Sequence, residues 1–281
     1  MGAHRNRTLD GIRGCLAIVV MTHHALWSIG YAFMSLPASY AVLGFFTISG
    51  CVLTKAWDGR YGAFLMRRVI RLWPLYALCL SAGWALSGIA FPFSLFVWLP
   101  ICSPVSGPAA NPPIWSLTVE AWAMLAMPAF VWVGRRSFLW LIAALEAAVL
   151  LQSLPAYMTT FFFCLFFFFL GAWISRFEIR VSLFESRIPQ WLGRISFPLY
   201  LCHDPIITFL GLPLIVSVPL SFGVAVILTE TVEKWSISAS RRIGRLAWQD
   251  ISAKSVARAV RLNFGGRMVG AVGIEPTTPP V

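Results

Sequence analysis

Long apolar stretches separated by short basic segments are the feature that most constrains this chain. A helix needs about 20 apolar residues to cross the hydrocarbon core of a bilayer. We count eight such stretches, at about residues 12–32, 38–57, 72–91, 113–133, 138–155, 157–175, 196–215 and 217–235. Only 12% of the residues are charged, against about 25% in soluble domains. We therefore predict an all-α fold, a polytopic membrane helix bundle with about eight transmembrane helices.

Lys and Arg are distributed unevenly among the connections between these stretches. Basic residues occur near residues 5–7, 60–71, 135–136 and 176–194 and from Lys234 onward, whereas the alternate connections around 33–37, 92–112, 156 and 216 have none. Because cytoplasmic loops carry the excess of Lys and Arg, we expect both termini to be cytoplasmic in a multi-pass protein of the cell (inner or plasma) membrane. The net charge of +11 then needs no nucleic-acid partner, and we expect none.

The chain divides into a membrane part and a tail. Residues 7–245 form the predicted integral-membrane domain, and its first apolar stretch is interpreted as a retained helix because it carries histidines. Residues 246–281 form a cytoplasmic tail, of which 246–264 have the composition of a basic interfacial helix and the rest lacks periodicity. The six cysteines match no metal-binding spacing and are expected to pack as small apolar residues, so no metal site is predicted.

Two adjacent histidines lie in the middle of the first apolar stretch. His24 follows Arg13 by eleven residues, which places both on nearly one helical face about 16 Å apart. Imidazole in such a position can act as a general base on a hydroxyl, or can instead be a structural group bonded to a neighbouring helix. His23 points about 100° away and is an accessory candidate. Asp10 is expected to cap the helix at its start.

A pair of arginines precedes the third stretch, in the sequence FLMRRVIRLWPLY. Arg68 and Arg71 are three residues apart and share a helical face. Guanidinium groups bind phosphate in a bidentate manner, so the pair is a candidate for holding a phosphorylated donor. Anchoring to lipid head groups explains the pair equally well.

Two further motifs place polar groups inside apolar stretches. In WSLTVEAW, Ser116 and Glu120 are four residues apart on one face, and a buried carboxylate there can orient an imidazole, although helix capping is the alternative. In ISFPLYLCHDPII, His203 and Asp204 fall inside the seventh stretch. His203 is either a second polar group of the same cavity or a hydrogen-bonded structural residue.

In order along the chain, these motifs resemble acyltransferase family 3, the integral-membrane O-acyltransferases. The ordered set is LDGIRG followed by HH, FFTISG, RRVIRLWPLY, WSLTVE, FFLGAW, ISFPLYLCHDPI and TETVEKW, and it covers about residues 7–242. The chain departs from the family in having fewer predicted spans and a charged loop at 176–194.

The resemblance implies transfer of an acyl group, often acetyl from acetyl-CoA, to a hydroxyl of a carbohydrate or another small molecule, as in polysaccharide modification. It implies acyl-CoA as co-substrate with no bound cofactor. Arg13, Arg68 and Arg71 would bind the donor and His24, Glu120 and His203 would act in catalysis, with Asp10, Ser116 and His23 accessory. A transporter of a small solute and a family member without activity are the alternatives.

Overall fold

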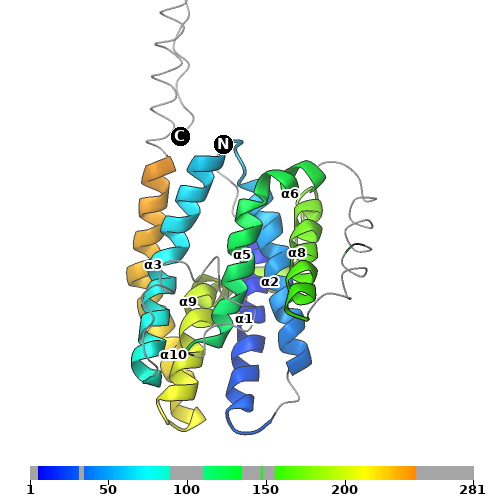
Figure 1. The fold of residues 1–281 in the computed structure, drawn as a ribbon. Helices are drawn as coiled ribbons and strands as arrows, with labels where there is room; N and C mark the ends of the chain where they lie inside the picture. Colours follow the sequence, from blue (N-terminus) through cyan, green and yellow to red (C-terminus); the bar gives the residue numbers. More distant parts are fainter. Residues whose placement is uncertain (1–5, 32–34, 89–109, 135–146, 148–155, 245–281) are drawn as a thin grey trace, which may run out of the picture.

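The computed structural model describes residues 6–31, 35–88, 110–134, 147 and 156–244, and these residues are helical without any strand. The predicted all-α fold is therefore confirmed for the described part of the chain (Figure 1). The helices are α1 (Arg7–Trp27), α2 (Ser35–Lys55), α3 (Tyr61–Ser87), η1 (Pro112–Ile114), α5 (Trp115–Leu125), α6 (Met127–Gly134), α8 (Ala156–Ile174), η3 (Ser182–Glu185), α9 (Arg187–Phe209), α10 (Leu214–Leu228) and η4 (Thr229–Glu233).

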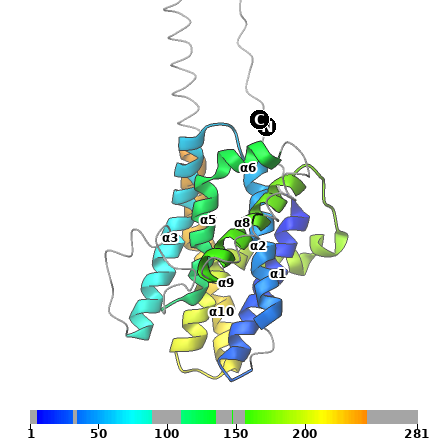
Figure 2. The ribbon, with the colours of Figure 1, turned by 45° about the vertical axis from the view of Figure 1, so that its right-hand side comes forward.

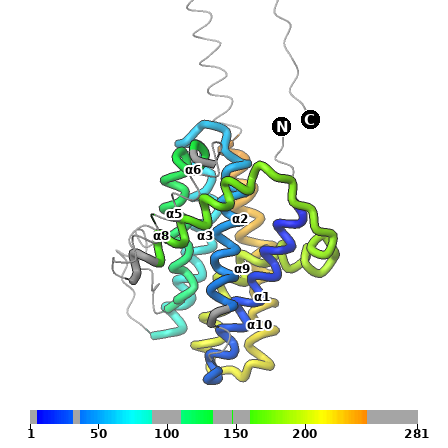
Figure 3. Tube along the Cα trace, turned by 90° about the vertical axis from the view of Figure 1, so that its right-hand side faces the viewer, coloured from blue at the N-terminus to red at the C-terminus, as the bar shows by residue number. Residues whose placement is uncertain are grey.

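The long helices run alternately up and down, and α1 packs against α9 (Figures 2 and 3). Two glycines make this central crossing possible. A Cβ atom at Gly14 would lie 2.4 Å from the backbone nitrogen of Gly193, and one at Gly193 would lie 2.1 Å from the carbonyl oxygen of Asp10. Small residues allow backbones to approach this closely in membrane helices. The crossing therefore holds α1 and α9 close together.

A second glycine crossing joins α2 to α8. A Cβ atom at Gly50 would lie 2.2 Å from the carbonyl oxygen of Phe168, and one at Gly171 would lie 1.9 Å from that of Thr47. Beside it, the Phe168 ring packs against Phe46 with centroids 5.2 Å apart. These glycines belong to the FFTISG and FFLGAW segments, so both segments serve helix packing.

Helix α9 contains a proline whose effect is compensated by a neighbouring segment. Pro205 has no N–H, which leaves the carbonyl of Leu201, four residues earlier, without its helical donor. The fully buried Asn111 donates from Nδ2 to this carbonyl at 2.8 Å. Asn111, immediately before η1, therefore both satisfies the freed carbonyl and fixes the start of α5 against α9.

The predicted spans match the described helices in part. Within the described part of the chain, three helices are long and apolar enough to cross a membrane, at residues 37–55, 61–87 and 214–244, and a shorter apolar helix covers 160–174. Helices α1 and α9 carry charged and imidazole side chains, which lower their mean hydropathy. The count of eight spans stays a prediction, and the span at 138–155 and the tail at 246–281 lie outside the described residues.

Several predicted boundaries change. The basic residues near 60–71, which we expected in the connection before the third span, belong to the helix of that span, because α3 begins at Tyr61 and continues through Pro74. The predicted span 113–133 is interrupted at Ala126, between α5 and α6. The expected loop at 176–194 ends where α9 begins, at Arg187, and its η3 turn contacts the start of α1, where Thr8 Oγ1 donates to Glu185 Oε1 at 2.7 Å.

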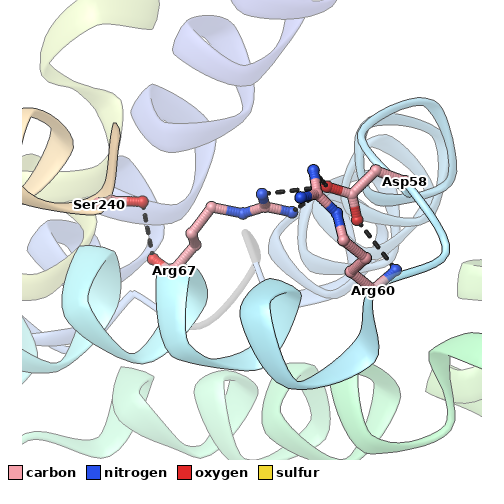
Figure 4. Close-up of polar contacts among 4 residues, drawn as sticks. All are labelled: Asp58, Arg60, Arg67 and Ser240. Atoms are coloured by element: carbon pink, nitrogen blue, oxygen red, sulfur yellow. Dashed lines mark hydrogen bonds and ion pairs between the residues drawn. The ribbon is translucent and has the colours of Figure 1, made fainter. Parts of the chain in front are cut away.

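The basic ends of the helices gather at one end of the bundle, the upper end in Figure 1, where the residues after η4 lie beside α3. Asp58 lies in the turn before α3 and accepts hydrogen bonds from Nη1 and Nη2 of Arg67, both at 3.1 Å, while Ser240 Oγ donates to the Arg67 carbonyl at 3.0 Å (Figure 4). Burial opposes ionisation of Asp58, but the bonds from the Arg60 backbone and the Arg67 guanidinium outweigh it and lower the pKa of Asp58. Asp58 thereby holds the Arg67 side chain, and Ser240 joins the residues after η4 to the backbone of the same turn of α3.

Candidate functional site

A cavity of about 750 Å³ opens among the helices at the basic end. It is lined by residues of α1, α2, α3, α5 and α9, by η4 and by the helix that continues to residue 244. Its charged lining comprises seven cationic side chains and three carboxylates: Lys55, Arg13, Arg68, Arg71, Arg194, Lys234 and Arg241, with Asp10, Glu120 and Glu233. The excess of positive charge makes the cavity suited to a polyanion.

The three predicted donor-binding arginines meet in this cavity although they come from two helices. Arg13 of α1 and Arg68 and Arg71 of α3 all line it and are half-buried. The Arg68 guanidinium also lies over the Phe64 ring, 5.8 Å from its centroid. Three guanidinium groups so close together repel one another, and a bound anion would relieve that repulsion. The arrangement therefore suits an anion such as a phosphate group, which either a donor or a lipid head group supplies.

Glu120 lies on the same cavity wall as these cations. It is close enough to Arg13 and Arg68 to interact with both electrostatically. We expected this carboxylate to orient the imidazole of His24, but the structure places it among the arginines. Its position suits charge balance and orientation of the guanidinium groups.

Asp10 also lines the cavity, but it does not cap α1 as predicted. The helix begins one turn earlier, and Oδ1 of its N-cap residue Asn6 accepts from the Leu9 N–H at 3.2 Å. Both residue types favour the N-cap position, and the interaction of Asn6 with the Ile179 carbonyl at 3.3 Å helps to fix the earlier start. Asp10 instead lies within the first turn of α1 and contributes a negative charge near Arg13.

Ser116 and Glu120 line the same cavity, as their spacing predicts. Ser116 Oγ lies 2.9 Å from the hydroxyl oxygen of Tyr200 on α9, and 3.1 Å from the carbonyl oxygen of Pro113. Tyr200 is buried, lines the cavity, and has its ring centroid 6.2 Å from that of His203. Ser116 and Tyr200 therefore form part of the cavity wall, and Tyr200 connects this wall to His203.

His24 lies outside the lining of the cavity and forms a pair with Asp204 of α9. Its Nδ1 is 2.7 Å from Asp204 Oδ1. An ionised carboxylate can only accept, so in this pair Nδ1 is the donor, and Nε2 is the nitrogen that carries the lone pair whenever the ring is neutral. The His24 side chain remains 23% exposed, whereas that of Asp204 is 5% exposed. This is the arrangement of a positioned general base.

His203 stands beside this pair and is fully buried. Its ring meets that of His24 edge to face, with centroids 5.1 Å apart. Nδ1 donates to the Leu199 carbonyl at 2.9 Å, and Nε2 has no hydrogen-bond partner within the described ranges. His203 therefore combines both interpretations: it is bonded to the helix backbone and adjoins His24.

His23 also contacts His24, with ring centroids 5.1 Å apart, and packs against Trp27. The predicted residues thus form two groups. One group lines the cavity and comprises Arg13, Arg68, Arg71, Glu120, Asp10 and Ser116. The other group, His24, His203 and His23, lies outside this lining. Asp204, Tyr200 and Asn111 were missed as site residues, and the adjacency of Asp204 to His203 was their only sequence signal.

Comparison with known proteins gives one family match. A family model described as an acyltransferase domain matches residues 6–189, which covers more than half of the chain and ends inside the first turn of α9. No curated protein and no solved structure matches the chain.

Proposed function

Because the chain belongs to acyltransferase family 3 and is an acyltransferase, we propose that it moves an acetyl or similar acyl group from acyl-CoA to a hydroxyl of a carbohydrate or other small molecule. The proposal includes residence in the cell membrane with the basic end of the bundle toward the cytoplasm, as the positive-inside rule requires. The observation that carries it is the His24–Asp204 pair, since this pair leaves Nε2 of His24 as a proton acceptor.

Electrostatic attraction to the arginines determines where the acyl donor binds. Its phosphates bind in the cavity at Arg13, Arg68 and Arg71, with Glu120 holding the guanidinium groups in position. Arg13 and His24 lie on one helix, eleven residues or about 16 Å apart. The acyl arm of a donor bound at Arg13 extends along α1 toward His24. Tyr200 and Ser116, whose hydroxyl oxygens are 2.9 Å apart, line the cavity that the donor enters.

The chemical step is a direct transfer. Nε2 of His24 takes the proton of the acceptor hydroxyl while the oxygen of that hydroxyl attacks the thioester carbonyl carbon. The C–S bond then breaks, and the imidazolium returns the proton to the departing thiolate. Asp204 keeps the ring in the correct tautomer and stabilises the imidazolium. The neighbouring His203 ring restricts how the His24 ring can turn.

Mass spectrometry of surface glycans and lipids tests this function in cells. Cells with the wild-type protein should carry an acyl mass increment that is absent from cells with an equally abundant His24→Ala protein. The Glu178→Gln protein is the matched control, because Glu178 lies in the exposed connection before α9. An increment that persists with His24→Ala would remove the histidine from the reaction.

A further inference from the structure

The helix that follows α10 contains a π-turn at the cavity wall. In η4 the Lys234 N–H donates to the Thr229 carbonyl, five residues earlier, in place of the usual four. Thr229 and Lys234 both line the cavity. In a regular α-helix, residues five apart point about 140° away from each other, so the π-turn is what brings Lys234 onto the same wall as Thr229. Turns of this kind occur frequently at functional sites.

The π-turn also determines which residues of the following turns reach the cavity. Ile237, Ser240 and Arg241 complete the wall after Lys234. Ser240 fixes this wall to α3 through the Arg67 carbonyl, and Arg67 is itself held by Asp58 (Figure 4). Arg241, a lining residue of the cavity, therefore directly follows a residue that is hydrogen-bonded to α3.

The cations of the cavity lie at two depths. Arg13, Arg68 and Arg71 are half-buried, whereas Arg194, Lys234 and Arg241 are exposed at its mouth. Lys234 forms an ion pair with Glu230, which reduces its share of the free positive charge. Arg241 is thus a stronger candidate than Lys234 for contact with a second anionic group.

We propose that Arg241, assisted by Lys234, binds a phosphomonoester of the donor that is distinct from the diphosphate held by the inner arginines. This inference rests on the proposed function and deepens it. Coenzyme A carries a diphosphate and, on its ribose, a 3′-phosphate, together roughly four negative charges at neutral pH. The lining has four more cationic groups than carboxylates, so the charge of the cavity matches a ligand with both groups.

The test compares binding of coenzyme A and 3′-dephospho-coenzyme A to the purified full chain by calorimetry in uncharged detergent. Wild type should bind coenzyme A roughly tenfold or more tightly than 3′-dephospho-coenzyme A, because a charge-assisted hydrogen bond contributes a difference of this size. Arg241→Ala should lower the affinity for coenzyme A to that for the dephospho form and leave the latter unchanged. Arg241→Lys should restore part of the preference. Arg242→Ala is the matched control, since Arg242 is exposed and does not line the cavity.

The possible results separate the two proposals. Equal wild-type affinities for both ligands, or equal weakening of both by Arg241→Ala, would overturn the second phosphate site and leave the proposed function standing. Failure of wild type to bind either ligand would overturn both. The measurement is repeated with phosphatidylglycerol nanodiscs as the probe. Binding of this lipid that is lost in Arg241→Ala would assign the arginine to lipid head groups and overturn the inference.

Discussion

His24 and Asp204 are 180 residues apart in the sequence, and their side chains meet at 2.7 Å between Nδ1 and Oδ1. The meeting depends on the close approach of α1 and α9, which the glycines at 14 and 193 permit. The pair therefore links the packing of the bundle to the chemistry of the site. A change in the crossing, in the carboxylate or in the cavity should each affect a different measurable step.

Asp204→Asn tests whether the carboxylate positions and charges the imidazole. An amide can hydrogen-bond either imidazole tautomer and cannot stabilise the imidazolium as a carboxylate does. We expect kcat to fall about a hundredfold or more, within the range of general-base contributions, with KM for the donor little changed. Steady-state acyl-transfer kinetics of the purified variant measure this. A variant with wild-type kcat at every pH would exclude the positioning role.

Gly193→Ala tests the central crossing. The added Cβ would lie 2.1 Å from the Asp10 carbonyl oxygen, so α1 and α9 must move apart. Thermal unfolding followed by tryptophan fluorescence should show a clearly lower Tm, and activity should fall because the His24–Asp204 distance grows. Gly62→Ala is the control, since a Cβ there meets nothing within 4 Å and Ala favours the helix by about 0.5–1 kcal/mol. Equal Tm changes in the two variants would contradict this account of the crossing.

Features that depend on a single helix could be predicted from the sequence, whereas contacts between helices could not. The apolar stretches predict helices, and the spacing of Arg68 and Arg71 or of Ser116 and Glu120 predicts a shared face, because these relations are local to one helix. The partner of His24 is not local. Asp204 and Glu120 are both carboxylates within apolar stretches, and only the packing of α9 against α1 decides between them.

The same limit explains the error at the start of α1. Asn6 and Asp10 are both good N-cap residues, and the contact of Asn6 with the Ile179 carbonyl, far along the chain, favours the earlier start. The span predicted at 196–215 contains Pro205, which lacks the N–H that a helix interior uses. The helix continues because Asn111, from another segment, satisfies the carbonyl that the proline leaves. The π-turn after Leu228 has no sequence signal that we recognise.

Asn111→Ala tests this compensation. Removing the amide leaves the buried Leu201 carbonyl without a donor, which should cost about 1–3 kcal/mol and lower the Tm. In a Pro205→Ala background, residue 205 regains an N–H that can bond the same carbonyl, so the cost of Asn111→Ala should shrink. A double-mutant cycle of thermal stability measures the coupling. Strictly additive effects would show that Asn111 and Pro205 act independently.

The pH dependence of Asp58→Asn tests the ion pair between Asp58 and Arg67 at the start of α3. Because hydrogen bonds lower the pKa of Asp58 in the folded state, its stabilisation is complete above the unfolded value of about 4. It is lost as the pH falls through the still lower folded pKa. Wild type should exceed Asp58→Asn in Tm at pH 7, and the difference should vanish in acid. A difference that is constant from pH 7 to pH 3 would argue against the charged interaction.

The most direct test of the central claim separates donor binding from chemistry in two purified variants. Coenzyme A affinity and acyl-transfer rate are measured for His24→Ala and Arg71→Ala, with Arg242→Ala as the surface control. We predict that His24→Ala binds coenzyme A like wild type but transfers no acyl group, whereas Arg71→Ala binds it at least tenfold more weakly. Full acyl transfer by His24→Ala, or unchanged coenzyme A affinity in Arg71→Ala, would contradict the account.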